Sequence, residues 1–195
     1  NALRALQELG IAESVVRAGS GLAGFELRHT SGRVLRRLDA QRLGVSTVVA
    51  LRPQLHGALM AAIDRAALRL GSEAVSFTEN AEGVALHLGD GSTDTGTLLV
   101  GADGVHSVIR RSLHPDEPAP RPSGFCAVRG VAYGAGAHLG DLSGVGYLGN
   151  AIEAATARAS SDAVYWYMSL RARDVADPSP QAILNARYPG FDPAL

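Results

Sequence analysis

The sequence predicts an α/β protein made of two parts. Strand-like and helix-like segments alternate over residues 1–113, and residues 97–113 have the order strand, tight turn and helix. Residues 114–122 then hold four prolines, which prevent a helix or a central strand and indicate a connection between domains. Strand-like segments follow this connection, so we expect a second domain that is built on a sheet.

Composition excludes several classes of protein. The 195 residues, 46% of them hydrophobic, carry a net charge of −1 and are enough for one or two globular domains. Basic residues are not in excess, so no nucleic-acid partner is expected. No apolar run reaches the roughly 18 residues of a membrane span. The single Cys126 cannot form an intramolecular disulfide and favours a reducing compartment such as the cytoplasm.

The motifs of other chemistries are absent. The six histidines show no metal-ligand spacing with Cys126 or with carboxylates, so metal catalysis is not expected. Neither a G-x-S-x-G motif nor a Walker-type loop occurs, which leaves hydrolase and NTPase functions without support.

Local signals predict the elements of the first 51 residues. Leucines spaced by three predict a helix at 2–9, which Gly10 ends, and a second helix spans 12–18. Strands at 25–29 and 34–38 form a hairpin in which Gly32 takes a positive φ. Its basic side is a solvated face or, alternatively, a docking surface for an anionic substrate or a pyridine nucleotide; it consists of Arg28, Arg33, Arg36, Arg37 and Arg42.

A strand at 45–51 leads to a helix with an arginine at its start. Apolar residues at helical spacing predict this helix at 53–70, and Pro53 suits its first position. Arg52 therefore lies at a helix N-terminus, where the helix dipole favours anions rather than cations. The arrangement is reasonable if an anion binds between the Arg52 guanidinium and the helix N-terminus. Alternatively, Arg52 is an ordinary surface arginine that precedes a helix.

Alternating residues predict strands at 74–79 and 84–88, joined by a turn at 89–91 to the strand at 97–100. Gly101, Ala102, Asp103 and Gly104 then form the turn, and Ser107 opens the helix. The glycines allow close approach of the backbone to a ligand, and Asp103 can accept hydrogen bonds from hydroxyls or amides. Alternatively, Asp103 only caps the helix.

The second part is expected to hold strands at 126–133 and 163–170, with turns or a loop at 134–149 between them. Alternation places Tyr165 and Tyr167 on one face of their strand and Trp166 on the other. Such aromatics belong either to the core or to a wall that stacks on a substrate. Ser179 caps a final helix, which Pro180 begins and which runs to Arg187.

The decamer GADGVHSVIR, residues 101–110, resembles the "DG" motif of the FAD-dependent aromatic hydroxylases, the class A flavin monooxygenases typified by p-hydroxybenzoate hydroxylase. The segments RPQLHGAL and NALRALQELGI also resemble that family. The resemblance implies an incomplete Rossmann-like FAD-binding domain at 1–113, the connection at 114–122 and a partial substrate domain with a β-sheet at 123–195. Whether the hairpin at 25–38 contributes to the substrate domain is left open.

The resemblance also implies the function and the cofactor contacts. NAD(P)H reduces FAD, the reduced flavin reacts with O₂, and one oxygen atom is transferred to an aromatic or other electron-rich small molecule. Arg52 is expected to reach the FAD phosphate and ribityl region, and the backbone near Val75 to pass the adenine end. Asp103 belongs to the FAD site together with Gly101, Ala102 and Gly104, and Arg110 is expected to fold back toward this turn to brace Asp103 or to meet a phosphate. The resemblance identifies no catalytic residue and no metal ligand.

Two motifs of the family, the N-terminal GxGxxG turn and a later Gly-Asp motif, do not occur in these residues. We interpret the chain as an internal fragment, which by itself should bind FAD weakly and lack oxygenase activity. We expect Arg52 and Asp103 to face one groove. The alternatives are a flavoprotein reductase that does not oxygenate and a catalytically inert truncated domain.

Overall fold

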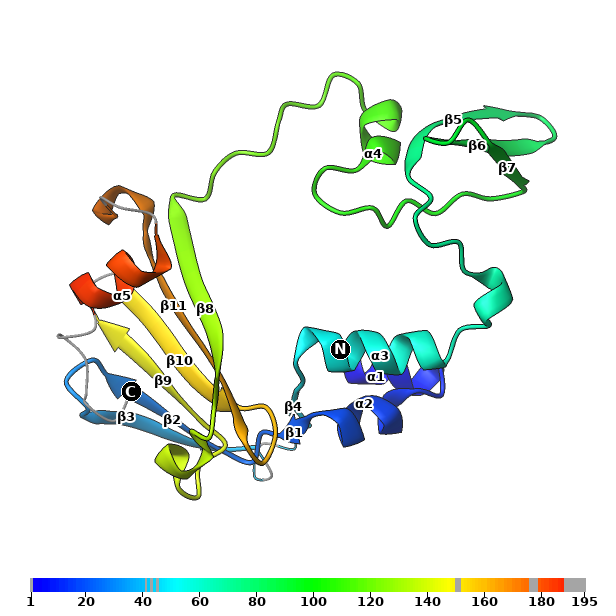
Figure 1. Cartoon of the computed structure of the whole chain (residues 1–195). Helices are drawn as coiled ribbons and strands as arrows, with labels where there is room; N and C mark the ends of the chain where they lie inside the picture. Colours follow the sequence, from blue (N-terminus) through cyan, green and yellow to red (C-terminus); the bar gives the residue numbers. More distant parts are fainter. Residues whose placement is uncertain are drawn as a thin grey trace. The chain divides into compact units, whose positions relative to one another are not determined.

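The structure, a computed structural model, describes residues 2–40, 42, 44, 46–149, 152–175 and 179–187. The chain forms two compact units (Figure 1): Asn1–Ile63 together with Ser123–Leu195, and Asp64–Pro122. Each unit is described by itself below. The predicted mixed α/β class is confirmed.

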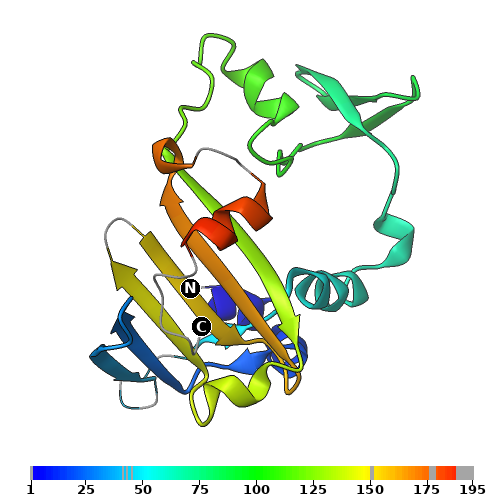
Figure 2. The ribbon, with the colours of Figure 1, turned by 60° about the vertical axis from the view of Figure 1, so that its left-hand side comes forward.

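A six-stranded sheet dominates the first unit (Figure 2). Its spatial order is β3 (Val34–Asp39), β2 (Gly24–His29), β9 (Gly144–Gly149), β10 (Ile152–Arg158), β11 (Ala163–Arg171) and β8 (Phe125–Tyr133). All neighbours are antiparallel except β2 and β9, which pair in parallel. The hairpin near the start of the chain thus belongs to the same sheet as the strands that follow the proline-rich connection.

One face of this sheet carries the hydrophobic core. The helix α5 (Pro180–Arg187) and the short 3₁₀ helix η2 (Gly136–Leu139) contribute Ile183 and Leu139 to it. The buried strand residues of this cluster are Val128, Val145, Tyr147, Ala154, Val164, Met168 and Leu170. Gly130 lets Trp166 lie flat on β8, because a Cβ at that position would come within 2.7 Å of the indole ring.

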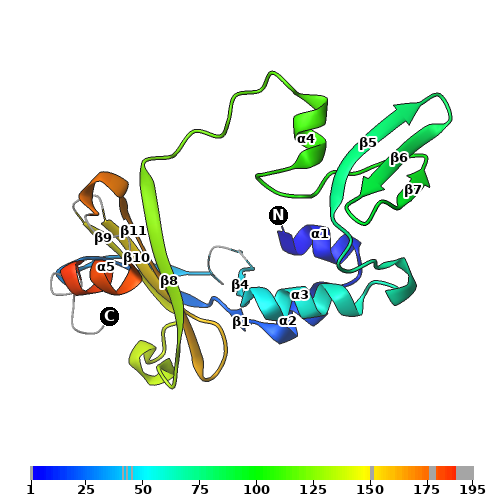
Figure 3. The same ribbon diagram turned by 45° about the horizontal axis from the view of Figure 1, so that its top comes forward.

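Three helices complete the first unit: α1 (Ala2–Glu8), α2 (Ala12–Ala18) and α3 (Arg52–Ala61). α3 packs against α2, as Figure 3 also shows. The short strands β1 (Ser20–Gly21) and β4 (Val48–Val49) pair beside them, and a 3₁₀ turn, η3 (Ala172–Asp174), follows β11. Both N-terminal helices and the hairpin turn at Gly32, whose φ is 85°, confirm the sequence predictions.

The second unit is an antiparallel meander with one helix. The strands β5 (Ala74–Asn80), β6 (Gly83–Leu88) and β7 (Thr93–Gly96) pair in that order, and α4 (Val108–Leu113) contacts β5. The strands predicted at 74–79 and 84–88 are therefore confirmed, as is the position of α4. A 3₁₀ turn, η1 (Arg65–Ala67), precedes the meander.

Several sequence predictions are wrong in part. The predicted helix at 53–70 ends at Ala61, because the Asp64 side chain accepts a hydrogen bond from the Ala66 N–H and starts η1 instead. Residues 134–149 include the strand β9, and β10 was not predicted at all. Of the strand predicted at 45–51, the structure shows only β4; Val45 lies outside the described residues.

The predicted buried strand at 97–100 is also wrong. The strand before the motif is β7, and residues 98–100 are irregular, with Leu98 and Val100 exposed to 79% and 75%. A short apolar run becomes a strand only where a neighbouring strand accepts its hydrogen bonds. Among the described residues, no strand pairs with this segment.

Candidate functional site

The turn at Gly101 to Gly104 and the start of α4 form one hydrogen-bonded unit around Asp103. Ser107 Oγ donates to Asp103 Oδ1 at 2.6 Å, and the Val108 N–H donates to Oδ2 at 2.7 Å. The Ile109 N–H makes a longer contact of 3.4 Å with the same oxygen. These bonds, that of Ser107 above all, lower the pKa of Asp103 from its usual 3.8, so its carboxylate is ionised at neutral pH.

Ser107 caps α4 as the sequence predicted. Its Oγ accepts a hydrogen bond from the Arg110 N–H at 2.9 Å while donating to Asp103. The capping role of Asp103 is thus present in the structure. Oδ1 accepts one hydrogen bond, from Ser107, and Oδ2 accepts one short bond, from Val108, besides the long contact to Ile109. Each oxygen of the ionised carboxylate can therefore accept a further bond from a ligand.

The backbone of the turn is open to a ligand. Gly101, Ala102, Asp103 and Gly104 are all exposed. Gly104 has a φ of 83°, and no atom lies within 4 Å of the position that a Cβ would take. Gly101 is required for packing, since a Cβ there would approach Ile109 to 2.9 Å. A carboxylate in an open glycine turn fits the hydroxyl groups of the FAD ribose or ribityl chain, so the residues present are compatible with FAD.

Arg110 does not brace Asp103: none of the hydrogen bonds described for Asp103 comes from its guanidinium, while a contact of Arg110 with a phosphate stays a prediction. Its guanidinium forms a two-point ion pair with Glu117, including a 2.6 Å bond between Arg110 Nε and Glu117 Oε2. The pair raises the pKa of Arg110 and lowers that of Glu117. Glu117 lies in the proline-rich connection, seven residues after Arg110. Because that segment has no helical or strand periodicity, the sequence did not indicate that the two side chains would pair.

Arg52 lies at the N-terminus of α3, as predicted, and is its first residue rather than the residue before it. The helix start is fixed by the Leu51 N–H, which donates to Gln54 Oε1 at 3.1 Å, and by Pro53 at the second helical position. Arg52 is exposed, and no described residue forms an ion pair or hydrogen bond with its guanidinium. Its charge is therefore available to an anion. Arg52 and Asp103 belong to different units, so their shared groove stays a prediction.

Val75 lies at a β-bulge. The register of β5 and β6 pairs Ala74 with Leu88 and Ser76 with His87, so Val75 is the extra residue. A bulged residue is left out of the ladder, and its backbone groups can bond to a ligand. Its side chain is 46% exposed. The bulge is compatible with the expected backbone contact with the adenine end of FAD, which stays a prediction.

The basic side of the hairpin is partly neutralised. Glu26 is buried at 2% exposure, and its carboxylate bonds to Arg28 at 2.7 Å and to Arg37 at 2.6 Å. Two of the five arginines that the sequence placed there therefore hold a buried acid.

Neither a metal centre nor a membrane helix is found in the part of the chain that the structure describes. No three His, Cys, Asp or Glu side chains there are grouped as a metal ion would require. None of the described helices is long and apolar enough to span a bilayer.

Known monooxygenases resemble the chain in sequence. 3-Amino-4-hydroxybenzoate 2-monooxygenase of Streptomyces cremeus is 32% identical over 137 residues, which are 67% of this chain and 34% of that protein. Aurachin C monooxygenase/isomerase of Stigmatella aurantiaca is 31% identical over 135 residues, 67% of this chain and 35% of that protein. The chain therefore spans about a third of the length of the curated relatives that it matches.

Solved structures show the same fold. A salicylate hydroxylase substrate complex matches 97% of this chain and 54% of its own with a TM-score of 0.76 and 25% identity. Klebsiella pneumoniae HpxO complexed with FAD and uric acid matches 98% of this chain and 51% of its own chain, with a TM-score of 0.83. At 23% sequence identity, this likeness concerns the fold alone.

A family model described as "FAD binding domain" matches residues 1–181. This match covers the motif around Asp103, the helix start at Arg52 and all six strands of the sheet. The resemblance to FAD-dependent aromatic hydroxylases that the motif predicted is confirmed. The chain belongs to the FAD binding domain family.

Proposed function

We propose that this chain is part of an FAD-dependent monooxygenase that uses NAD(P)H and O₂ to hydroxylate an aromatic or other electron-rich small molecule. The family match and the two monooxygenase relatives support this proposal. The structural observation that carries it is the exposed, ionised carboxylate of Asp103, held by the start of α4 in an open glycine turn.

The residues of the chain have separate roles in holding the cofactor. Asp103 accepts a hydrogen bond from a hydroxyl of FAD, and Gly101, Ala102 and Gly104 let the backbone approach it. Arg52 neutralises part of the pyrophosphate charge. The backbone of Val75, at the bulge of β5, bonds to the adenine end. The bound flavin supplies the redox chemistry with NAD(P)H and O₂, while the protein supplies binding and orientation.

Arg110 enters this proposal only indirectly, because Glu117 holds its guanidinium. We assign it to bracing the end of α4 rather than to contacting FAD. The domain assignment, with cofactor contacts before Leu113 and the substrate sheet after Ser123, belongs to the same proposal. So does a location in the cytoplasm, which rests on the single free Cys126.

The test uses the full-length protein and four variants. Asp103→Ala and Arg52→Ala are compared with the matched exposed controls Asp116→Ala and Arg65→Ala. FAD affinity is measured by quenching of flavin fluorescence, and oxygen uptake and product are followed with NADH and NADPH. We expect the two site variants to weaken FAD binding at least tenfold and the controls to match the parent protein.

Three outcomes would change the conclusion. A full-length protein that binds no FAD would contradict the whole proposal. FAD binding that is equally strong in all variants would show that the contacts have been assigned to the wrong residues. NAD(P)H oxidation that yields hydrogen peroxide but never a hydroxylated product, over a range of aromatic compounds, would favour a reductase.

A further inference from the structure

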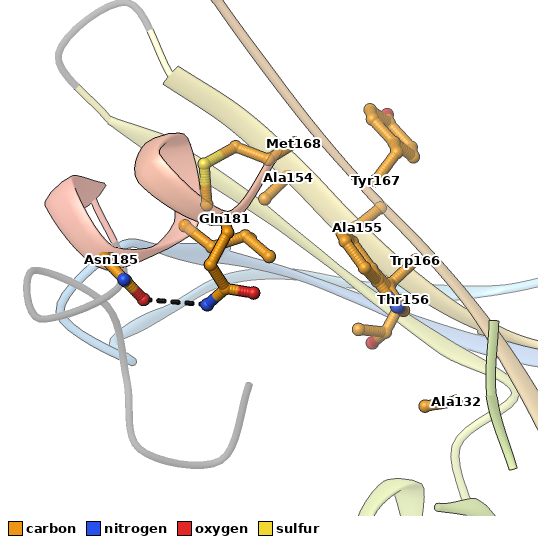
Figure 4. A pocket seen from close by; sticks show the side chains of 10 residues that line it. Ala132, Ala154, Ala155, Thr156, Trp166, Tyr167, Met168, Gln181 and Asn185 are labelled. Atoms are coloured by element: carbon orange, nitrogen blue, oxygen red, sulfur yellow. Dashed lines mark hydrogen bonds between the residues drawn. The ribbon is translucent and has the colours of Figure 1, made fainter. Parts of the chain in front are cut away.

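A cavity of about 570 Å³ lies beside α5, on the face of the six-stranded sheet that carries the hydrophobic core. Successive residues of a strand point to opposite faces, so Trp166 and Met168 of β11 point to this face and Tyr167 points away. Figure 4 shows this division: Met168 lies toward α5, and Tyr167 lies on the opposite side of β11. Pockets of about 300–1,000 Å³ are of the size that holds small molecules in proteins.

Small side chains leave this cavity open. Ala154 of β10 is opposite Met168 in the sheet, and Ala132 of β8 is opposite Val164, so both alanines point to the same face as Trp166. Ala154 and Met168 are buried, which makes this part of the lining apolar. Leu184 of α5 adds a further apolar wall. The cavity therefore favours the apolar surface of a ligand.

Two polar groups in the lining lack a partner. Thr156 and Trp166 are directly opposite each other in the register of β10 and β11, and Thr156 is only 9% exposed. No described residue forms a hydrogen bond with the Thr156 hydroxyl or with the Trp166 indole N–H. In the described part of the chain, every side-chain nitrogen or oxygen that is sealed from solvent has a partner. These two groups are therefore accessible, and the cavity that they line is open to them.

The chemistry of the lining selects the ligand. All described residues of the lining, including Ala155 and Tyr167 between the residues named above, are uncharged. A charged ligand would lose its hydration there without gaining a counter-ion, so the ligand is uncharged. The indole N–H can only donate and the threonine hydroxyl can donate, so the ligand has to offer an acceptor. An indole ring and the sulfur of Met168 both favour contact with a flat ring.

The amide side chains of α5 do not replace these donors. Gln181 Nε2 donates to Asn185 Oδ1 at 3.0 Å along α5 (Figure 4). Both residues are exposed, so they lie at the mouth of the cavity, where water can satisfy their remaining groups. Thr156 is mostly buried, and its hydroxyl gains more from an acceptor that a ligand brings.

We propose that this cavity is a ligand site separate from the residues assigned to FAD. It binds a flat, uncharged ring whose nitrogen or carbonyl oxygen accepts hydrogen bonds from the Trp166 N–H and the Thr156 hydroxyl. The ring lies against Trp166 and Met168. The inference does not rest on the proposed function, since no residue of the cavity has been assigned a part in holding the cofactor.

The test compares three bicyclic probes of similar shape by calorimetric titration of the full-length protein, at a pH where isoquinoline is uncharged. Isoquinoline has a ring nitrogen as acceptor, naphthalene has no acceptor, and 2-naphthoate carries a charge. We expect isoquinoline to bind at least tenfold more tightly than either of the others. Its addition should also shift the indole N–H resonance of Trp166, which is identified by its absence in Trp166→Phe.

Variants test the two donors one at a time. Thr156→Val keeps the shape of the side chain and removes the hydroxyl, and Trp166→Phe keeps an aromatic ring and removes the N–H. Each should lower the affinity for isoquinoline at least fivefold and that for naphthalene less than twofold. Thr95→Val, on the exposed strand β7, is the matched control and should keep the parent affinities.

Three outcomes would overturn the inference. The first is equal affinity for isoquinoline and naphthalene, which would mean that no donor is used. The second is parent-like binding of isoquinoline in both donor variants. The third is a full-length protein that binds none of the probes, which would show that another part of its chain fills the cavity. FAD binding and product formation are measured separately, so none of these outcomes contradicts the proposed function.

Discussion

Ser107 and Asp103 share a hydrogen bond of 2.6 Å, and the same Ser107 oxygen accepts the Arg110 N–H of α4 at 2.9 Å. One hydroxyl thus joins the glycine turn to the helix. Replacing it by alanine removes both bonds at once. The Asp103 carboxylate would then be held only by backbone N–H groups.

Ser107→Ala is therefore expected to lower the free energy of unfolding by about 1 kcal/mol, the usual cost of losing an N-cap. FAD affinity should fall as well, because the carboxylate loses its fixed orientation. Urea unfolding and FAD titration measure the two effects. Ser112→Ala, which removes only a bond to the Val108 carbonyl within α4, serves as the control and should leave FAD affinity unchanged.

Acid should loosen the start of α4. The pKa of Asp103 is lower in the folded protein than its usual 3.8, so its contribution to stability is fully present above about pH 3.8. That contribution is lost as the pH falls through the lower, folded value. Amide exchange at Val108, followed from pH 6 to pH 2, should accelerate in this acid range, after correction for the intrinsic pH dependence of exchange. Asp103→Asn should abolish the acid dependence, and an unchanged profile would contradict the assignment.

The ion pair of Arg110 and Glu117 is expected to act locally. Because the two side chains are 58% and 39% exposed, solvent screens their attraction. Arg110→Ala and Glu117→Ala should therefore have equal, small effects on unfolding, and neither should change FAD affinity by more than twofold. An effect of Arg110→Ala on FAD that Glu117→Ala does not share would show that the guanidinium contacts the cofactor.

Glu26 should be the most sensitive charged residue of the hairpin. Its carboxylate is buried and bonded to both Arg28 and Arg37, so Glu26→Gln removes two ion pairs of a buried charge at once. We expect a loss of about 3 kcal/mol in the free energy of unfolding. Glu13→Gln is the control: its pair with Arg17 is exposed, and a change of about 0.3 kcal/mol is expected. Equal losses in the two variants would contradict the burial of Glu26.

Local signals were sufficient where an element is defined by its own residues. The cap at Ser107, the turn at Gly32 and the Pro53 helix start could all be predicted, because each depends on contacts within a few residues. The motif itself predicted the family and indicated that Asp103 belongs to the FAD site. Its hydrogen-bond partners in α4 are also close in sequence, so the capping alternative could be stated in advance.

Non-local pairing explains most of the misses. β9 and β10 are rich in glycine and alanine and gain their extended form from the neighbouring strands β2 and β11. The cavity that Thr156 and Trp166 line could not be found without β10. Conversely, residues 97–100 have strand-like side chains but no partner strand among the described residues. Arg110 was misplaced because its partner Glu117 lies in a connection with no periodic pattern.

The parallel pairing of β2 with β9 has a consequence for the order of folding. In the sequence, β2 precedes the second unit and β9 follows it. The sheet that joins them therefore cannot form during synthesis until β9 has left the ribosome. The Asp64–Pro122 unit is continuous, and its meander joins strands that are close neighbours in the chain, so it should fold early. Until β9 arrives, the hairpin of β2 and β3 leaves one edge of β2 without a partner, and this edge is where we expect a nascent chain to need a chaperone.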